Sequence, residues 1–300
     1  MLANREVKVV AIGGGHGLSR LLQALKLCQF DFGAVIATTD DGGSTGRLRQ
    51  RHGGIALGDI RHCISALTDD EHLGKLLLDY RFEQDDELHG HNLGNLMLLA
   101  LDQLCVSPSD AIDLLRRLLA VSQPLLPMSD SSTQLRANYH GGLTIVGETA
   151  IDAAHHLPSQ LGLEPSVSAA TEAMQLVAAA DAILVGPGSL LTSLCPTFLV
   201  TELQALLAQK PIGFICNLSS ESGPIGLRSN REQIELFEHY AQVNVTCALS
   251  HGEQPAAVGA DAQAGLHLQA PLIGLEAKQH CPKLLAQALP LLVAKLTAHR

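Results

Sequence analysis

The stretch that decides the fold is VKVVAIGGGHG, residues 7–17. Its first half, Val7 to Ile12, is a short apolar run rich in β-branched residues and bounded by glycine, which is typical of a buried parallel strand. Leucines at helical spacing follow the glycines, from Leu18 to Leu25. A second apolar run lies at residues 33–39. This region is therefore expected to form a strand, a helix and a second strand joined by a right-handed crossover.

The rest of the chain continues this pattern. Apolar runs at residues 181–185 and 212–216 predict further buried strands. Between about residues 60 and 165 we expect an insertion, made of helices and then of a hairpin around the turn at 140–142. The sequence thus predicts an α/β fold with a mostly parallel sheet, helices on both faces and this helical and hairpin insertion. We expect a single domain over residues 1–300.

The composition limits the classes of function. The net charge of −10 argues against a nucleic-acid binder, which needs a broad basic face to neutralise phosphates. No apolar run reaches the ~18 to 20 residues that span a bilayer, and the first residues have no signal-peptide core. The seven cysteines are scattered and never form a C-x-x-C pair, which argues against disulfides and structural zinc. We therefore expect a cytoplasmic protein that binds neither nucleic acid nor a membrane.

The glycine loop after the first strand is the first candidate site. Glycines let main-chain N–H groups approach a phosphate closely, and the helix N-terminus adds unpaired donors and a positive dipole. The dinucleotide fingerprint is incomplete because Leu18 replaces its last glycine, and no Lys-Ser/Thr pair completes a P-loop. A simple tight turn remains the alternative interpretation. The candidate ligand-binding residues here are Gly13, Gly14, Gly15, His16 and Gly17.

A second candidate site follows the second strand. Asp40 and Asp41 stand where that strand is expected to end, and ligands of open parallel sheets bind outside the carboxyl ends of the strands. Mg²⁺ commonly bridges one or two carboxylates to ligand phosphates. We therefore predict Asp40 and Asp41 as metal ligands, with a solvated turn as the alternative. Residues 40–54 are interpreted as a loop, in which the other candidate ligand-binding residues are Gly42, Gly43, Ser44 and Arg47.

Weaker signals complete the candidate set. Four arginines at residues 47, 49, 51 and 61 form a basic cluster that suits phosphate contacts, with a solvated basic face as the alternative for at least two of them. Asn92 is interpreted either as a helix cap or as a contact to a base or sugar. Ser189 is interpreted either as a helix cap or as part of a third loop on the same rim. The further candidate residues are Asp59, Arg61, Asn92, Asn95, Gly186, Gly188 and Ser189.

Five ordered motifs together resemble the putative gluconeogenesis factor family, also called YvcK/YbhK, of the CofD-like group. They are IGGGHGL at 12–18, TDDGGSTGR at 39–47, GDIR at 58–61, GHNLGNL at 90–96 and GPGSLLTS at 186–193. The resemblance runs from about residue 7 to residue 220. It implies a Rossmann-like fold with a nucleotide site at the strand carboxyl ends. It also implies a cytoplasmic protein linked to cell shape and to growth on gluconeogenic carbon sources.

The resemblance implies ligands as well. Some members of the family bind UDP-sugars, and the related branch includes the 2-phospho-L-lactate transferase of coenzyme F420 synthesis, a Mg²⁺-dependent enzyme with a nucleotide-linked donor. The glycine loop and paired acidic residues of that enzyme correspond to residues 13–17 and 40–41 here. One departure concerns NLSSESGP at residues 217–224. Many members carry a Gly-Glu-Thr-Asp-Gly-Tyr stretch there, whose tyrosine is associated with UDP-sugar contact.

Two functional hypotheses follow. We favour a nucleotide or nucleotide-sugar binding protein without turnover, needed for the regulation of cell shape during gluconeogenic growth, because the phosphate-binding rim lacks an obvious catalytic base. The alternative is a Mg²⁺-dependent phospho-group transferase of the 2-phospho-L-lactate transferase type. Neither needs a tightly bound organic cofactor, and self-association into a homo-oligomer is left open. The incomplete fingerprint argues against a dinucleotide-dependent oxidoreductase.

Overall fold

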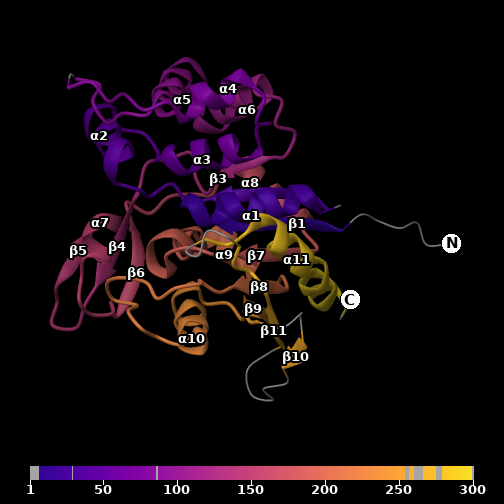
Figure 1. Ribbon diagram of the computed structural model, residues 1–300. Helices are drawn as coiled ribbons and strands as arrows, with labels where there is room; N and C mark the ends of the chain where they lie inside the picture. The colour runs from indigo at the N-terminus through magenta and orange to yellow at the C-terminus, as the bar shows by residue number, and fades with distance from the viewer. Residues whose placement is uncertain are drawn as a thin grey trace.

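A computed structural model describes residues 7–28, 30–85, 87–253, 257–259, 266–274 and 279–298. Its centre is an eight-stranded sheet with the order β10-β11-β9-β8-β7-β1-β2-β3 (Figure 1). These strands are β1 (Lys8–Gly13), β2 (Asp31–Ile36), β3 (Leu125–Pro127), β7 (Ala182–Val185), β8 (Ile212–Ile215), β9 (Cys247–His251), β10 (Ala257–Gly259) and β11 (Leu266–Ala270). Neighbouring strands in this described part of the chain are parallel, apart from the antiparallel pair of β10 and β11.

The strand order shows where the sheet can accept a ligand. From one edge, the sheet runs β3-β2-β1 and then β7-β8-β9, which is the order of a doubly wound Rossmann-type sheet. The order reverses between β1 and β7, so the loops that leave these two strands turn in opposite directions. Such a switch point opens a crevice at the carboxyl ends of the strands. The predicted Rossmann-like α/β fold with a mostly parallel sheet is therefore confirmed.

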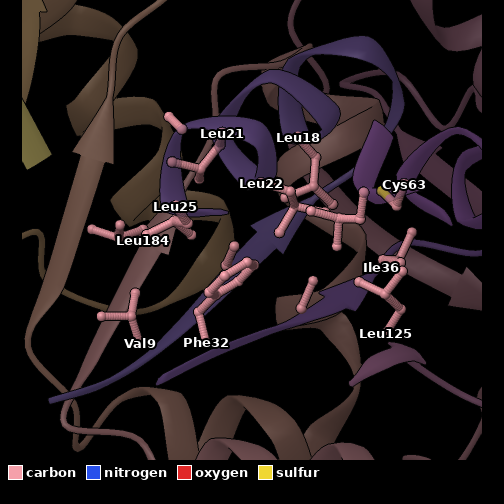
Figure 2. Close-up of a cluster of buried hydrophobic side chains, with 14 of the residues drawn as sticks. Val9, Leu18, Leu21, Leu22, Leu25, Phe32, Ile36, Cys63, Leu125 and Leu184 are labelled. Carbon is pink, nitrogen blue, oxygen red and sulfur yellow. The ribbon is translucent and has the colours of Figure 1, made fainter. Parts of the chain in front are cut away.

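Helices cover both faces of the sheet because the strands carry apolar side chains in both directions. Val9 and Phe32 belong to the same core as Leu22 and Leu25 of α1 (Figure 2), whereas Val10 belongs to the core on the opposite face. The first face carries α1 (Gly15–Leu27), α3 (Gly58–Leu67) and α11 (Pro282–Thr297). The second carries α8 (Thr171–Ala179), α9 (Thr201–Leu207) and α10 (Asn230–Ala241). None of the helices in the described residues combines the length and apolarity needed to cross a membrane.

Two further units extend from this layered core. Helices α4 (Leu73–Asp79), α5 (Leu93–Leu104) and α6 (Pro108–Leu118) gather at one end of the molecule (Figure 1). A small antiparallel sheet has the order β5-β4-β6, with strands β4 (Gln134–Asn138), β5 (Thr144–Val146) and β6 (Gln160–Glu164) and the helix α7 (Glu148–Asp152). Strands β4 and β5 form the predicted hairpin. Between the two units, β3 returns to the main sheet beside β2.

The structure corrects one predicted element beside the site. The chain forms helix α2 (Gly43–His52), whereas the sequence pattern predicts a loop over residues 40–54. The prediction is wrong because α2 buries Ser44, Thr45 and Gly46 rather than a stripe of large apolar side chains. After β7 the chain forms a wide helical turn over Leu190–Leu194 and a 3₁₀ turn over Pro196–Leu199.

Candidate functional site

A backbone contact joins two of the predicted loops at the switch point. Gly17, in the first turn of α1, lies against the carbonyl oxygen of Pro187, in the loop that follows β7. A Cβ atom at Gly17 would collide with that oxygen. Gly15 starts the helix with a φ of 61°, in the left-handed region that favours glycine. The structure thus brings the predicted loops 13–17 and 186–189 together.

The side chain of Asp59, in the first turn of α3, lies against the N-terminus of α1. Its carboxylate accepts a hydrogen bond from the Gly15 N–H, and it lies so close to Gly14 that a Cβ atom there would collide with it. Burial and the nearby charge of Asp40 raise the pKa of Asp59 to about 7, although the Gly15 N–H and Arg61 act in the opposite direction. The glycine loop therefore holds a carboxyl group of the protein itself, beside the place where a ligand phosphate is expected.

Asp40 and Asp41 have different partners although they are adjacent in the sequence. One Asp40 oxygen accepts a hydrogen bond from the Gly42 N–H at 2.9 Å, and the other faces Gly58 at the start of α3. Asp41 accepts hydrogen bonds from the N–H and the hydroxyl of Thr149, at 2.9 and 2.7 Å, and so holds the first turn of α7. Of the two predicted metal ligands, Asp40 faces α3 and Asp41 faces α7.

Glu148 is a site residue that the sequence pattern does not reveal. It stands at the start of α7 and accepts a hydrogen bond from the Thr39 hydroxyl. Burial raises its pKa well above the ordinary value, and the charges of Asp59, Asp40 and Asp152 act in the same direction. No motif marks Glu148, because it lies 109 residues beyond Thr39 in the chain and reaches the strand end only through the fold.

The carboxylates of Asp40, Asp59 and Glu148 form a group that we call the carboxylate cluster. Burial and then their like charges raise the pKa values of Asp59 and Glu148, and a divalent cation would relieve the repulsion between these charges. Oxygen-only donors suit Mg²⁺ better than a softer metal. Within the described residues, no three His, Cys, Asp or Glu side chains are arranged to hold a metal by themselves. A cation here would therefore need further oxygens from water and from a ligand phosphate, as Mg²⁺ commonly takes.

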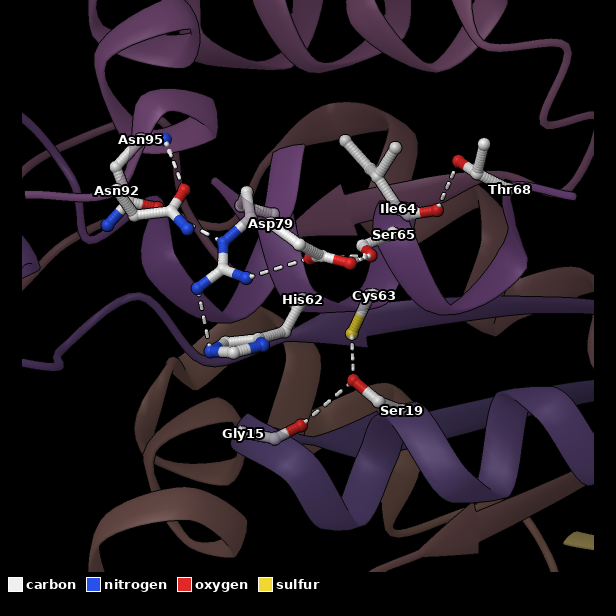
Figure 3. A network of polar contacts seen from close by, with 11 residues as sticks. Gly15, Ser19, His62, Cys63, Ile64, Ser65, Thr68, Asp79, Asn92 and Asn95 are labelled. Carbon is white, nitrogen blue, oxygen red and sulfur yellow. Dashed lines mark hydrogen bonds and ion pairs between the residues drawn. The ribbon is translucent and has the colours of Figure 1, made fainter. Parts of the chain in front are cut away.

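Arg61 holds helices together in a buried network (Figure 3). Its guanidinium donates to Asn95 at 3.3 Å and to Asp79 at 3.4 Å, and it contacts the His62 ring at 2.9 Å. Asn92 caps α5 by accepting a hydrogen bond from the Asn95 N–H at 3.3 Å. Arg61, Asn92 and Asn95 are all buried. They support the start of α3, which carries Asp59, and the capping interpretation of Asn92 is confirmed.

The same network fastens the start of α2. Gly42 is the N-cap of this helix and Gly43 its first residue. The Ser44 hydroxyl accepts a hydrogen bond from the Asn95 side chain at 3.4 Å and lies 3.1 Å from a ring nitrogen of His91. The hydroxyl of Ser44 therefore serves contacts between α2 and α5, rather than standing free on the rim.

The four arginines of the predicted basic cluster have different roles. Arg49 donates to four main-chain carbonyl groups, those of Thr39, Asp40, Thr133 and Gly54, at 3.0, 2.9, 2.5 and 3.4 Å. It thereby holds the strand end that carries Asp40. Arg47 and Arg51 are exposed on the same helix, in agreement with a solvated basic face for two of the four.

The loop after β7 is joined to the loop after β8. Asn217 pairs with the main chain of Gly188 through two hydrogen bonds, of 3.0 and 2.9 Å. Glu221 accepts a hydrogen bond at 3.1 Å from the first main-chain N–H of the wide helical turn. Ser189 instead donates to Asp152 at 3.4 Å. Ser189 therefore stands at the predicted N-cap position, but its hydroxyl makes no capping hydrogen bond, and Glu221 accepts the first N–H of the turn instead.

These loops line a cavity of about 380 Å³, which we call the switch-point cavity. Its lining includes the predicted residues His16, Gly17, Gly188 and Ser189. It also includes Asp152, Asn217, Glu221 and His280, which no motif marks because they come from α7, from the loop after β8 and from the segment before α11. The charge of Asp152 also acts on Glu148. The cavity and the carboxylate cluster are therefore neighbouring parts of one site.

The chain is similar to proteins of one family. The family model described as 2-phospho-L-lactate transferase CofD matches residues 9–265. A Vibrio cholerae protein named "Putative gluconeogenesis factor" is 44% identical over 252 residues, which cover 83% of this chain and 85% of the relative. A Thermotoga maritima protein of the same name is 35% identical over 253 residues, with 83% and 80% covered. A crystal structure of a UPF0052 family member from Bacillus halodurans has a TM-score of 0.87 at 27% identity and covers 95% of this chain and 99% of that one.

Proposed function

Because the chain belongs to the 2-phospho-L-lactate transferase CofD family, together with the proteins named gluconeogenesis factor, we propose that it binds a nucleotide or a nucleotide sugar with Mg²⁺ at the switch point. It acts as a binding protein without turnover. The bound state regulates cell shape while cells grow on gluconeogenic carbon sources.

The single observation that carries the proposal is the position of the carboxylate cluster beside the switch-point cavity. The cavity lies between α1 and the loops after β7 and β8, where doubly wound sheets bind nucleotides. Asp40 and Asp59 lie on the other side of the start of α1, towards α3. The cavity would take one part of the ligand, and the carboxylates of Asp40 and Asp59 would hold the cation that bridges to its phosphates.

The charges of the site support the role of Mg²⁺. A phosphate that approached Asp40, Asp59 and Glu148 directly would be repelled, because all of them carry negative charge when ionised. Asp40 and Asp59 would hold the cation, with Glu148 behind them, and Mg²⁺ would neutralise the ligand diphosphate. The chain itself places these carboxylates: Gly15 holds Asp59 through its N–H, and Arg49 holds the main chain of Asp40.

Ligand binding can be tested by thermal unfolding and by isothermal titration calorimetry. The probes are UDP-, GDP-, ADP- and CDP-glucose and their nucleoside diphosphates, each with and without Mg²⁺. A ligand at about 100 times its dissociation constant stabilises the fold by roughly 2.7 kcal/mol, which corresponds to a shift of a few degrees. We expect a shift with one nucleotide class that depends on Mg²⁺. No shift with any probe at millimolar concentration would reject the proposal.

The metal role is tested by Asp40→Asn. This variant removes one carboxylate charge and is expected to lose the Mg²⁺-dependent part of ligand binding, at least tenfold in affinity, while its unfolding midpoint without ligand stays close to that of the parent. The exposed Asp85→Asn is the matched control and should bind like the parent. Equal Mg²⁺ dependence of Asp40→Asn and the parent would contradict the assignment.

The cellular role needs a genetic test. A deletion strain should lose its normal shape on a gluconeogenic carbon source and keep it on glucose. The parent gene should restore the shape, and the gene for Asp40→Asn should not. Full complementation by a variant that has lost ligand binding would show that the cellular role does not depend on this site.

One observation favours a second candidate function, a phospho-group transferase of the 2-phospho-L-lactate transferase type. Asp59 has a pKa near 7 and lies beside Asp40, so if Asp40 alone held the cation, Asp59 could accept the proton of an attacking hydroxyl group. In such a reaction the hydroxyl oxygen attacks phosphorus, the phosphoanhydride bond breaks and a nucleoside monophosphate leaves. Mass spectrometry of nucleotide-linked donors with hydroxyl acceptors and Mg²⁺ tests this. The absence of any nucleoside monophosphate above the level without protein would reject turnover.

A further inference from the structure

Two histidine rings lie against each other beside the carboxylate cluster. His16 is the second residue of α1, and His62 stands one turn after Asp59 on α3. The centroids of the two rings are 4.4 Å apart and their planes are tilted by 50°. His16 is exposed and belongs to the lining of the switch-point cavity. A ligand at the start of α1 can therefore reach the ring of His16, whereas half-buried His62 supports that ring from behind.

Arg61 fixes the His62 ring. Its guanidinium lies 2.9 Å from Nε2 of His62, and a guanidinium group can only donate hydrogen bonds. Nε2 is therefore the acceptor, and burial followed by the charges of Arg61, His16 and Arg81 lowers the pKa of His62 to about 3. Arg61 is itself held by Asn95 and Asp79. The buried network of Figure 3 thus continues through His62 to the exposed ring of His16.

The charges that act on this ring are positive. Burial and the charges of Arg61 and Arg20 lower the pKa of His16. Charges that disfavour a proton on the ring favour a negative group beside it. Asp152 and Glu221 also line the cavity, but they come from α7 and from the loop after β8, and their charges are not among those that act on His16. The α1 side of the cavity is therefore where an anionic group is favoured.

The histidine pair lies close to the place where the proposed cation would hold a phosphate. Gly15 donates to Asp59, and the next residue of α1, His16, meets His62. Asp59 and His62 are three residues apart on α3, which is about 4.5 Å along the helix axis. A diphosphate that is bridged to Mg²⁺ at Asp59 can therefore also bring a phosphate oxygen to the His16 ring.

We propose that His16 and His62 form a phosphate subsite, in which the His16 ring donates a hydrogen bond to a phosphate oxygen of the bound nucleotide and His62 holds that ring in place. This inference rests on the proposed function and adds a protein donor to the contacts of the ligand diphosphate. His16 is the binding residue of the subsite, and His62 is a positioning residue that acts through it.

The role of His16 is tested with two variants of this residue. His16→Phe keeps a flat ring against His62 but has no N–H group, whereas His16→Gln keeps an N–H donor without the ring. Isothermal titration calorimetry with Mg²⁺ uses UDP, GDP, ADP and CDP and their glucose derivatives, and inorganic pyrophosphate is measured by displacement of the nucleotide that binds best. We expect His16→Phe to weaken both the nucleotide and pyrophosphate by about tenfold, the effect of one lost hydrogen bond to a charged group. His16→Gln should lose less, and the exposed His239→Phe on α10 is the control and should bind like the parent.

The pyrophosphate measurement shows whether the contact is to a phosphate. Unchanged affinity of His16→Phe for the nucleotide overturns the inference. A loss of nucleotide binding without a loss of pyrophosphate binding also overturns it, because the contact would then be to the nucleoside or the sugar. So does pyrophosphate that fails to displace the nucleotide from the parent at millimolar concentration. If the parent binds none of the nucleotides, the proposed function itself fails, which distinguishes that outcome from a failure of the histidine pair.

The positioning role of His62 is tested by His62→Ala and His62→Phe. His62→Ala removes the ring that supports His16 and should weaken nucleotide and pyrophosphate binding by roughly two- to tenfold, the effect of one lost ring pair. His62→Phe restores a ring there and should bind more tightly than His62→Ala, although neither variant offers Arg61 an acceptor. Parent-like binding by His62→Ala contradicts the positioning role. Equal losses in the two variants also contradict it, because the loss would then come from Arg61 and not from the ring.

Discussion

Asp59 shows how strongly a single side chain depends on the fold around it. Its carboxylate accepts a hydrogen bond from the Gly15 N–H at the start of α1 and lies close enough to Asp40 to be affected by its charge. Burial and the second carboxylate favour the protonated form, and the pKa of Asp59 rises to about 7. This side chain therefore changes its charge close to neutral pH, where an ordinary aspartate is fully ionised.

The pKa of Asp59 predicts a pH dependence of stability. Between about pH 4 and pH 7 the folded protein keeps a proton on Asp59 that the unfolded chain releases, so the free energy of unfolding falls as the pH rises through this range. Asp59→Asn removes this contribution. Both proteins should be unfolded in urea at pH 5 and at pH 8. From pH 5 to pH 8, the free energy of unfolding of the variant should rise relative to that of the parent by on the order of 2 kcal/mol. Parallel changes in the two proteins would show that Asp59 titrates normally.

Arg49 is expected to matter more than its exposed neighbours on α2. Its planar guanidinium donates to four carbonyl groups at once, and the single ammonium of a lysine cannot reproduce this fork. Arg49→Lys should lower the free energy of unfolding by roughly 1 to 2 kcal/mol and weaken Mg²⁺-dependent ligand binding, because Asp40 loses its support. Arg51→Lys on the same helix is the control and should change neither quantity. Similar values for the two variants would reject the supporting role.

Among the elements, several helices begin at the site, and carboxylates of the protein accept hydrogen bonds from their first N–H groups. Asp59 accepts from the start of α1, Asp41 from the start of α7, and Glu221 from the start of the wide helical turn after β7. Each carboxylate comes from a different segment than the helix start it meets. Anions at helix N-termini are stabilised by unpaired N–H groups and by the helix dipole. The site therefore contains several helix N-termini that favour anions, and carboxyl groups of the protein itself already lie at these N-termini.

The contact between α1 and the loop after β7 gives a prediction for the elements. Gly17→Ala places a Cβ atom against the Pro187 carbonyl, so the first turn of α1 must move away from the loop. Such overpacking costs about 1 to 3 kcal/mol, and the variant should also lose ligand affinity because the cavity changes shape. Calorimetric unfolding and ligand titration measure both effects.

Gly162→Ala is the control for this substitution. In β6 the added Cβ would meet only the end of the Arg136 side chain at an ordinary distance, 3.4 Å. The control should keep both the stability and the ligand affinity of the parent. If Gly17→Ala behaves like Gly162→Ala, the two loops are not coupled as the contact indicates.

At the scale of the whole molecule, one sheet separates two aliphatic cores. Leu22 belongs to the core on the side of α1, and Leu203 belongs to the core on the side of α9. Both side chains are fully buried. Because neighbouring strand residues contribute to opposite cores, as Val9 and Val10 do, loss of either core should disrupt the same sheet.

This arrangement predicts cooperative unfolding of the chain as one unit. Leu22→Ala and Leu203→Ala should each lower the free energy of unfolding by about 2 to 5 kcal/mol. Both should shift one common transition in calorimetry and in far-ultraviolet circular dichroism, and the double variant should show roughly the sum because the sites lie on opposite faces. Two separate transitions, each sensitive to one of the substitutions, would contradict the prediction of a single domain.

The sequence by itself determined the layered framework of this protein. The run from Val7 to Ile12, its glycine loop and the leucines of α1 predict the first strand–helix unit, because side-chain periodicity reports which faces of a local element are buried. The later strands at 181–185 and 212–216 are found in the same way. The loops at strand ends are then expected to lie on one rim, since the carboxyl ends of parallel strands share one edge of the sheet.

Only the tertiary structure decided which groups meet on that rim. Asp59 lies over the glycine loop, Glu148 reaches it from an inserted helix, and His280 reaches the cavity from the segment before α11. Helix α2 was also not predicted from the sequence, which indicates a loop there, because the helix buries small residues that form no apolar stripe. The physical reason is the same in each case. Periodicity and turn chemistry are local, whereas the charges, pKa values and unpaired atoms of this site depend on contacts between segments far apart in the chain.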